Sequence, residues 1–131
     1  MKQINKYIVE RLHINKDTGN NHYNYYPKTR NELKELVYKL IEERGYNADL
    51  NDIDTSEITD MNYMFYTSKF NGDISNWDVS TVENMGYMFW DSSFTGKNGD
   101  ISNWDVSNVK NMSLMFKKSP LQKNPPKWYK E

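Results

Sequence analysis

The chain has 131 residues, no cysteine and a formal net charge of −1 at pH 7. This length predicts one domain with a modest core, and the lack of cysteine excludes a disulfide framework, a thiolate metal site and a cysteine nucleophile. Aromatic residues make up 15% of the chain, which argues against a disordered protein.

The beginning of the chain predicts a β-hairpin. Residues 6–14 carry the apolar and aromatic side chains of a first strand, and residues 17–21 form a turn cluster of Asp, Thr, Gly and Asn. Residues 22–26 alternate polar side chains with tyrosines, as a second strand would. Pro27 ends that strand, because proline has no backbone N–H to donate to a sheet.

A helix is predicted from Thr29 to Arg44. Thr29 and Glu32 have the spacing of a capping box, and Gly45 follows as a C-terminal cap. The apolar side chains of this segment form one stripe: Leu33, Leu36, Val37, Leu40 and Ile41. We interpret residues 1–47, the hairpin plus the helix, as a cap over the repeats that follow.

An internal repeat dominates the rest of the chain. Residues 72–80 and 99–107 share the same nine-residue sequence, Gly-Asp-Ile-Ser-Asn-Trp-Asp-Val-Ser. The similarity extends downstream, so that Met61, Met85 and Met112 correspond, at spacings of 24 and 27 residues. Such a period indicates stacked structural units and determines the architecture ahead of local propensity. We assign residues 48–116 to a repeat region.

Each repeat unit predicts one strand and one short helix. Trp77 and Val79 are two residues apart, so a strand would place both on one face. The spacing of the next apolar residues is that of one helical face: Val82, Met85, Met88 and Phe89. The predicted strands are parallel and lie near 50–55, 74–79 and 101–106, with a further one near 126–129. The fold class expected is therefore α/β, a short leucine-rich-repeat-like solenoid of parallel strands and short helices, capped by an N-terminal β-hairpin plus helix.

Residues 117–131 have two interpretations. The spacing from Phe116 to Leu121 to Trp128 is five and seven residues, as it is from Phe65 to Phe70 to Trp77, and this predicts a degenerate last repeat. The high Lys and Pro content is also typical of an unstructured tail. In either case the whole chain, 1–131, is expected to form a single domain.

The repeat unit resembles that of the BspA-like leucine-rich-repeat surface proteins of bacteria. Their units read approximately Phe-Asn-x-Asp-Ile-Ser-x-Trp-Asp-Val-Ser-x-Val-x-x-Met-x-x-Met-Phe. Residues 70–89 and 94–116 carry this pattern almost completely, and residues 49–65 carry it in part. The resemblance implies a scaffold used in adhesion or protein binding, and it transfers no catalytic residue to this chain.

Charge is unevenly distributed along the sequence. Residues 48–116 contain eleven acidic and three basic side chains, a formal balance of −8. This balance favours a protein partner with a basic surface and disfavours direct nucleic-acid binding at the repeats. The candidate partner-binding acids are those on the outward strand positions: Asp52, Asp54, Asp78 and Asp105. Two other roles remain open for them, which are hydrogen bonding to nearby backbone N–H groups and a calcium site.

Four aromatic residues fall outside the inward positions of the repeats. They are Tyr63, Tyr66, Tyr87 and Trp90. An exposed aromatic patch of this kind anchors many protein interfaces, so these residues are candidates for partner binding. Packing against the cap or against a neighbouring repeat is the alternative.

These observations predict a monomeric, non-enzymatic protein–protein interaction module that needs no cofactor or metal. No nucleotide-binding, metalloprotease or hydrolase motif is present, so we do not expect an enzyme. No signal peptide or transmembrane segment is recognisable, which predicts a cytoplasmic protein without a membrane partner. One alternative is a phage- or mobile-element-encoded inhibitor that occupies the basic groove of a host defence nuclease. Another is a structural or adhesive fragment of a bacterial surface array.

Overall fold

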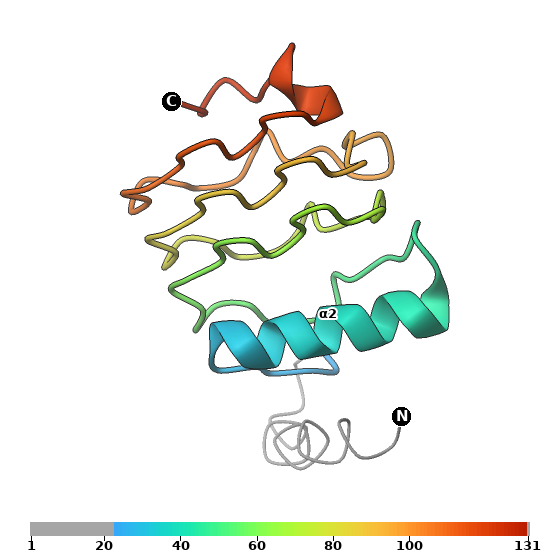
Figure 1. Cartoon of the computed structure of the whole chain (residues 1–131). Coiled ribbons are helices and arrows are strands. Elements are labelled where there is room, and N and C mark those ends of the chain that lie inside the picture. The colour runs from blue at the N-terminus through green and yellow to red at the C-terminus, as the bar shows by residue number, and fades with distance from the viewer. Residues whose placement is uncertain (1–22, 131) are drawn as a thin grey trace.

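The computed structural model describes residues 23–130. Within them the helices are α2, an α-helix spanning Arg30–Arg44, and η1, a 3-10 helix spanning Pro120–Gln122. Figure 1 shows α2 along one end of the molecule, with the chain climbing away from it in successive turns towards η1 and the C-terminus. The first strand and the turn predicted for the N-terminal hairpin lie outside the described residues.

Helix α2 confirms the helix predicted from the sequence. The Thr29 side-chain oxygen accepts a hydrogen bond from the Glu32 N–H at 3.1 Å, which caps the first turn. At the other end, the Gly45 N–H donates to the Ile41 carbonyl at 2.7 Å, with a φ of 96° that favours glycine. The side chains that bury this helix against the repeats are Leu33, Leu36, Val37 and Leu40.

The predicted solenoid of parallel strands and short helices is wrong. Residues 23–130 contain no strand, and the β-bridges among them are isolated and parallel. These bridges are Tyr25–Ile53, Asp49–Asp73, Asp60–Asn84 and Asn84–Asn111. The first of these bridges involves Tyr25, which lies in the predicted second strand of the hairpin. The described part of that segment therefore pairs with the repeat region, in parallel. The predicted helix at 82–89 is absent as well, and turns replace it.

Local hydrogen bonding explains why the Trp-Asp-Val-Ser segments do not form strands. The Trp77 N–H donates to the Ile74 carbonyl at 3.1 Å, which closes a tight turn. The next residue, Asp78, accepts the N–H of Ser80 on its carboxylate at 2.9 Å. Because these N–H groups are bonded within their own segment, they are not available for a ladder with the next repeat.

A chain of four-residue β-turns replaces the predicted helices. Met88 donates its N–H to the Met85 carbonyl and Trp90 to the Tyr87 carbonyl, both at 3.2 Å. The alternate N–H groups, those of Met85 and Tyr87, donate instead to the next repeat. Six non-glycine residues of this region have a positive φ: Tyr63, Thr67, Tyr87, Asp91, Leu114 and Lys118. Residues with a positive φ do not fit a right-handed helix. The apolar spacing of three residues that predicted a helix is equally the spacing of these turns.

Stacked rings form the centre of the core. Phe65, Phe89 and Phe116 lie one above another, with centroids 5.5 Å apart at each step and planes within 6° of parallel. Trp77 and Trp104, which occupy the same place in consecutive repeats, are buried, with 3% and 6% of their surface exposed. Side chains at equivalent positions of consecutive repeats therefore stack in columns and bury one another.

The C-terminal segment packs against this core. Trp128 stacks on Trp104 with ring centroids 6.1 Å apart, and its indole N–H donates to the Ile101 carbonyl at 2.9 Å. The indole N–H groups of the two preceding tryptophans make the same kind of bond, Trp77 to Leu50 and Trp104 to Ile74. The position predicted for Trp128 from its spacing is therefore the position it takes.

Candidate functional site

The four aromatic residues singled out in the sequence lie together on the turns. Tyr63 stacks on Tyr87 with centroids 4.8 Å apart and planes 3° from parallel, and Tyr66 stacks on Trp90 at 5.0 Å. Tyr63 and Tyr66 also meet edge to face at 4.9 Å. We call these four residues the aromatic face. Tyr63 and Tyr66 are 36% and 38% exposed, so the face combines mutual packing with access to solvent.

The repeat period and the turn geometry together position the aromatic face. Tyr63 and Tyr87 occupy the same place in consecutive repeats, with φ values of 60° and 58°. The positive φ turns each tyrosine outward between Met residues that point into the core. Lys118, whose equivalents in the earlier repeats are Thr67 and Asp91, also has a positive φ, and its ammonium nitrogen lies 5.0 Å from the centre of the Trp90 ring.

Three of the four candidate aspartates bond to their own segment. Asp54, Asp78 and Asp105 each accept the backbone N–H of the serine two residues later, at 2.9–3.0 Å. The serine hydroxyl adds a second bond in two cases, at 2.6 Å to Asp78 and 2.7 Å to Asp105. These serine bonds hold the pKa of the Asp105 carboxyl below its ordinary value. The hypothesis of local backbone capping is confirmed for these three residues.

Asp52 has a different environment. It forms a two-pronged ion pair with the Arg44 guanidinium, with both N–O distances 3.0 Å, and it accepts a bond from the Asn24 amide at 2.9 Å. Partial burial by itself raises the pKa of the Asp52 carboxyl, but the bonds from Arg44 and Asn24 outweigh it and hold the pKa below its ordinary value. Asp52 therefore joins the end of α2 to the first repeat, and the sequence offered no signal for this partner.

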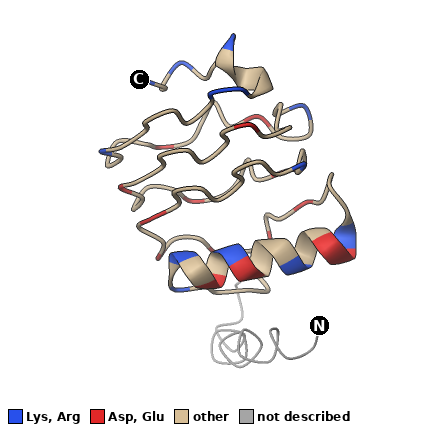
Figure 2. Cartoon of the chain, viewed as in Figure 1, with Lys and Arg blue, Asp and Glu red and all other residues tan. Residues whose placement is uncertain are grey.

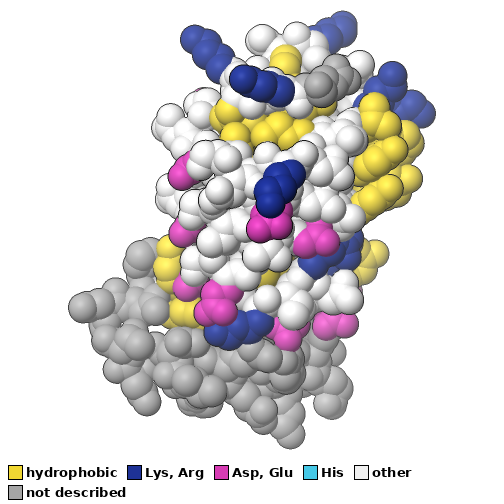
Figure 3. All heavy atoms as spheres, turned by 90° about the vertical axis from the view of Figure 1, so that its left-hand side faces the viewer, with side chains coloured by type: hydrophobic (Ala, Val, Ile, Leu, Met, Phe, Trp, Pro, Cys, Tyr) yellow, Lys and Arg dark blue, Asp and Glu magenta, His cyan; other side chains and the backbone are white. Residues whose placement is uncertain are grey.

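Basic and acidic side chains are unevenly distributed along the molecule. Figure 2 shows basic and acidic residues alternating on α2, more acidic than basic residues on the turns, and Lys at the C-terminal end. Figure 3 shows one face of the molecule, on which Asp and Glu lie over the middle and Lys side chains project at the end away from the grey atoms. Hydrophobic side chains gather along one edge of the same view.

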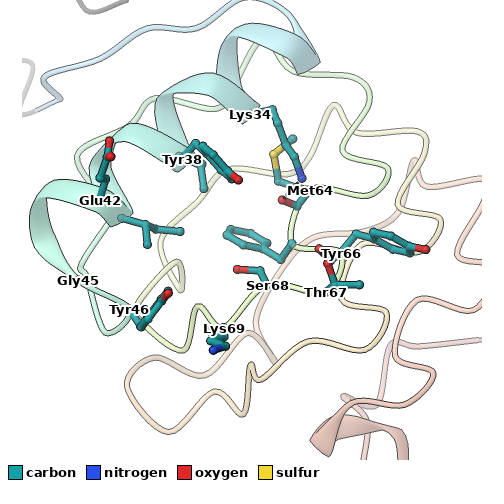
Figure 4. Close-up of a pocket in the computed structure, with 13 residues that line it drawn as sticks. Lys34, Tyr38, Glu42, Gly45, Tyr46, Met64, Tyr66, Thr67, Ser68 and Lys69 are labelled. Carbon is teal, nitrogen blue, oxygen red and sulfur yellow. Dashed lines mark hydrogen bonds between the residues drawn. The ribbon is translucent and has the colours of Figure 1, made fainter. Parts of the chain in front are cut away.

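A groove between α2 and the first repeat is the feature that sequence reasoning missed. It has a volume of about 800 Å³ and lies between α2 with its following loop on one side and residues 64–69 on the other. Figure 4 shows Lys34, Tyr38 and Tyr46 facing this second wall. The Lys34 ammonium donates to the carbonyl oxygens of Tyr63 and Met64 at 2.7 and 2.8 Å. Nothing in the local sequence distinguishes Lys34 from the other lysines of the helix.

The lowered pKa of Lys34 predicts how this residue's contribution to the free energy of unfolding changes with pH. Burial, with a smaller effect from the nearby Arg30 charge, lowers this pKa from 10.5 to about 8. Between pH 8 and 10 the unfolded chain binds the proton more tightly than the native protein does, so the contribution of Lys34 to stability rises with pH. We expect the free energy of unfolding of the wild type, relative to Lys34→Met, to increase by about 1 kcal/mol from pH 7 to pH 9.5, because the side chain is only partly buried.

Urea denaturation of both proteins at the two pH values measures this effect. Lys39→Met, which changes another partly buried lysine of the same helix, is the control. A constant difference between wild type and Lys34→Met across this range would contradict the lowered pKa.

Residues 23–130 bring no three His, Asp or Glu side chains into a group that could hold a metal ion. The calcium site considered for the aspartates therefore has no assembled ligand set in the described part of the chain. In that same part, α2 is too short and too polar to cross a bilayer.

Comparison with known proteins identifies the family of the chain. No significant match is found among curated proteins or among solved structures. The family model described as "Mycoplasma protein of unknown function, DUF285" matches residues 31–130, from the start of α2 to the end of the described structure. This match supports the resemblance to BspA-like proteins at the level of the repeat family. The chain belongs to the DUF285 family.

Proposed function

We propose that this protein is a non-enzymatic protein–protein interaction module that binds its partner through the aromatic face. The observation that carries the proposal is the pair of partly exposed aromatic stacks, Tyr63 on Tyr87 and Tyr66 on Trp90. Tyrosine and tryptophan supply a large contact area for few rotatable bonds and dominate the energetics of many interfaces. Stacking holds these rings in place before binding, so a partner loses little affinity to ordering them.

The aspartates have an accessory role in this proposal. Asp78 and Asp105 are exposed acidic side chains, and each is held in place by hydrogen bonds from the serine that follows it. Together with the other acids of residues 48–116 they favour encounter with a basic partner and make the association rate fall as salt increases. The hypothesis of an inhibitor that occupies a basic groove needs this charge. The adhesive hypothesis needs only the aromatic face.

Alanine variants of the aromatic face test the proposal. Partners captured from a lysate of the source cells by the wild type are purified, and their affinity is measured by calorimetry. We expect Trp90→Ala and Tyr66→Ala each to weaken binding about 30-fold, the usual loss at an interface hot spot. Tyr38→Ala removes a tyrosine that is 77% exposed on α2, outside the aromatic face, and it should bind as wild type does.

Melting temperatures of the variants establish that each one is folded. Unchanged affinity of both Trp90→Ala and Tyr66→Ala, in folded proteins, would contradict the proposal. A loss of binding in Tyr38→Ala alone would place the interface on α2 and the groove beside it.

A further inference from the structure

Residues 61–67, 85–91 and 112–118 are equivalent segments of turns in consecutive repeats. The hydrogen bonds between these segments all run in one direction. Along the turn at 61–67, the N–H groups of alternate residues donate to carbonyl oxygens of the next turn, as from Phe65 to Met88 at 2.8 Å. The turn at 85–91 does the same towards the turn that follows it, as from Phe89 to Met115 at 2.9 Å. This part of the stack therefore has a carbonyl end near α2 and an N–H end near the C-terminus.

The carbonyl end is already occupied. The Asn62 carbonyl accepts a hydrogen bond from the Arg30 side chain at 2.7 Å, and the Met64 carbonyl accepts one from the Lys34 ammonium at 2.8 Å. These are the carbonyls that a preceding turn would bond, since the equivalent Gly86 and Met88 carbonyls accept from the turn before them. Helix α2 thus supplies cationic donors in place of another turn.

At the N–H end, three donors have no partner among residues 23–130. The N–H groups of Met112, Leu114 and Phe116 are equivalent to those that donate in the two earlier turns, and none has an acceptor among residues 23–130. At the next equivalent position the Lys118 N–H is bonded, to the Gln122 side-chain oxygen at 2.8 Å. We call the three unbonded N–H groups the donor edge. Met112 and Leu114 are half-buried and Phe116 is buried, so leaving these donors unpaired is unfavourable.

We propose that the donor edge binds an extended, acidic peptide segment of another protein. Carbonyl oxygens of alternate peptide residues would accept the three N–H bonds, as the segments 84–88 and 111–115 do within the stack. This is strand addition, in which backbone bonds give affinity and side chains give selectivity. The site is separate from the aromatic face, and the proposal goes beyond the function proposed above.

Charge complementarity specifies an acidic peptide. Residues 117–130 contain five lysines and no acidic residue. Figure 2 shows several Lys positions along this end of the chain, and Figure 3 shows Lys side chains projecting there. A positively charged border favours acidic side chains on a peptide that lies along the donor edge.

A second copy of this chain does not fit the donor edge. At its carbonyl end Arg30 bonds the Asn62 carbonyl and Lys34 bonds the Met64 carbonyl, so no three consecutive acceptors of this register are free there. Its own N–H end would oppose donors to donors. Residues 23–130 of a second copy therefore offer no matching acceptor set for the donor edge, which favours a segment of another protein as the occupant.

Amide hydrogen exchange followed by NMR tests the proposal with an eight-residue peptide of alternating glutamate and valine. The bonded amides of Met85, Tyr87 and Phe89 serve as internal controls. In the free protein, we expect the amides of the donor edge to exchange at least about tenfold faster than these controls. Saturating peptide should slow the donor-edge amides about tenfold and leave the controls unchanged.

Four results would overturn the proposal. Slow exchange of the donor edge in the free protein at every concentration would mean that a group within the chain accepts these bonds. Protection that grows with protein concentration would identify a second copy as the occupant. A lack of protection by the glutamate peptide, or equal protection by a peptide of alternating lysine and valine, would contradict an acidic extended ligand.

Charge-reversal variants test the selectivity separately. Lys117→Glu changes the exposed lysine that directly follows Phe116, and Lys123→Glu changes the exposed lysine next to Gln122, which bonds the Lys118 N–H. Each should weaken binding of the glutamate peptide about fivefold. Lys69→Glu changes an exposed lysine in the first repeat and is the matched control. Affinity that is insensitive to both changes, or that falls equally in Lys69→Glu, would show that these lysines do not select the peptide.

Discussion

Trp77→Ala is expected to lower the free energy of unfolding by about 3–5 kcal/mol, the usual cost of truncating a buried tryptophan. Trp77 is 3% exposed and packs beside Phe65, with ring centroids 5.8 Å apart. Its indole N–H also donates to the Leu50 carbonyl at 2.9 Å. The variant removes this donor and leaves the buried Leu50 carbonyl without it. Such a loss is a large share of the stability of a domain of this size.

Two related variants separate packing from hydrogen bonding. Trp77→Phe keeps most of the ring and loses the bond to Leu50, so it should cost about 1–3 kcal/mol. Trp128→Ala removes the equivalent residue of the C-terminal segment, which is half-buried, and should cost less than Trp77→Ala. Urea denaturation measures all three. Wild-type stability of Trp77→Ala would mean that this side chain does not pack in the core in solution.

Gly72→Ala is expected to destabilise the protein by about 3 kcal/mol, at the upper end of the usual cost of overpacking. A methyl group on Gly72 would overlap the backbone oxygen and nitrogen of Ala48 in the preceding turn. The neighbouring Asp73 N–H donates to the same Ala48 carbonyl at 2.9 Å, so separating the two backbones breaks this bond. The clash is between two backbones and no side-chain rotation relieves it.

Gly86→Ala is the matched control for this change. Its added methyl group would meet side-chain amide atoms, Asn111 Nδ2 at 3.2 Å and Asn84 Oδ1 at 3.3 Å, which can shift by a few tenths of an ångström. Both changes restrict the unfolded chain to the same extent, so the difference between them reports the native structure. Equal midpoints of urea denaturation for the two variants would show that the close approach at Gly72 is absent.

The sequence predicts the candidate site in part. Repeat spacing places Tyr63 with Tyr87 and Tyr66 with Trp90, because equivalent residues of stacked units must lie one above another. The same spacing predicts the contact of Trp128 with the preceding tryptophan. It does not predict Lys34, because the groove that lowers its pKa exists only where α2 meets the first repeat. The sequence does not predict the ion pair of Asp52 with Arg44 either, because these residues meet only where α2 contacts the first repeat.

Local chemistry and period are what the sequence by itself determined. Helix α2 follows from its capping residues and its apolar stripe, and the buried tryptophans follow from the repeat. The path of the backbone was decided by the tertiary structure. An apolar spacing of three residues suits both a helix and a chain of turns, and the choice depends on whether alternate N–H groups find acceptors in the next repeat. Those acceptors, such as the Asn111 and Ser113 carbonyls for Met85 and Tyr87, exist only once the repeats are stacked.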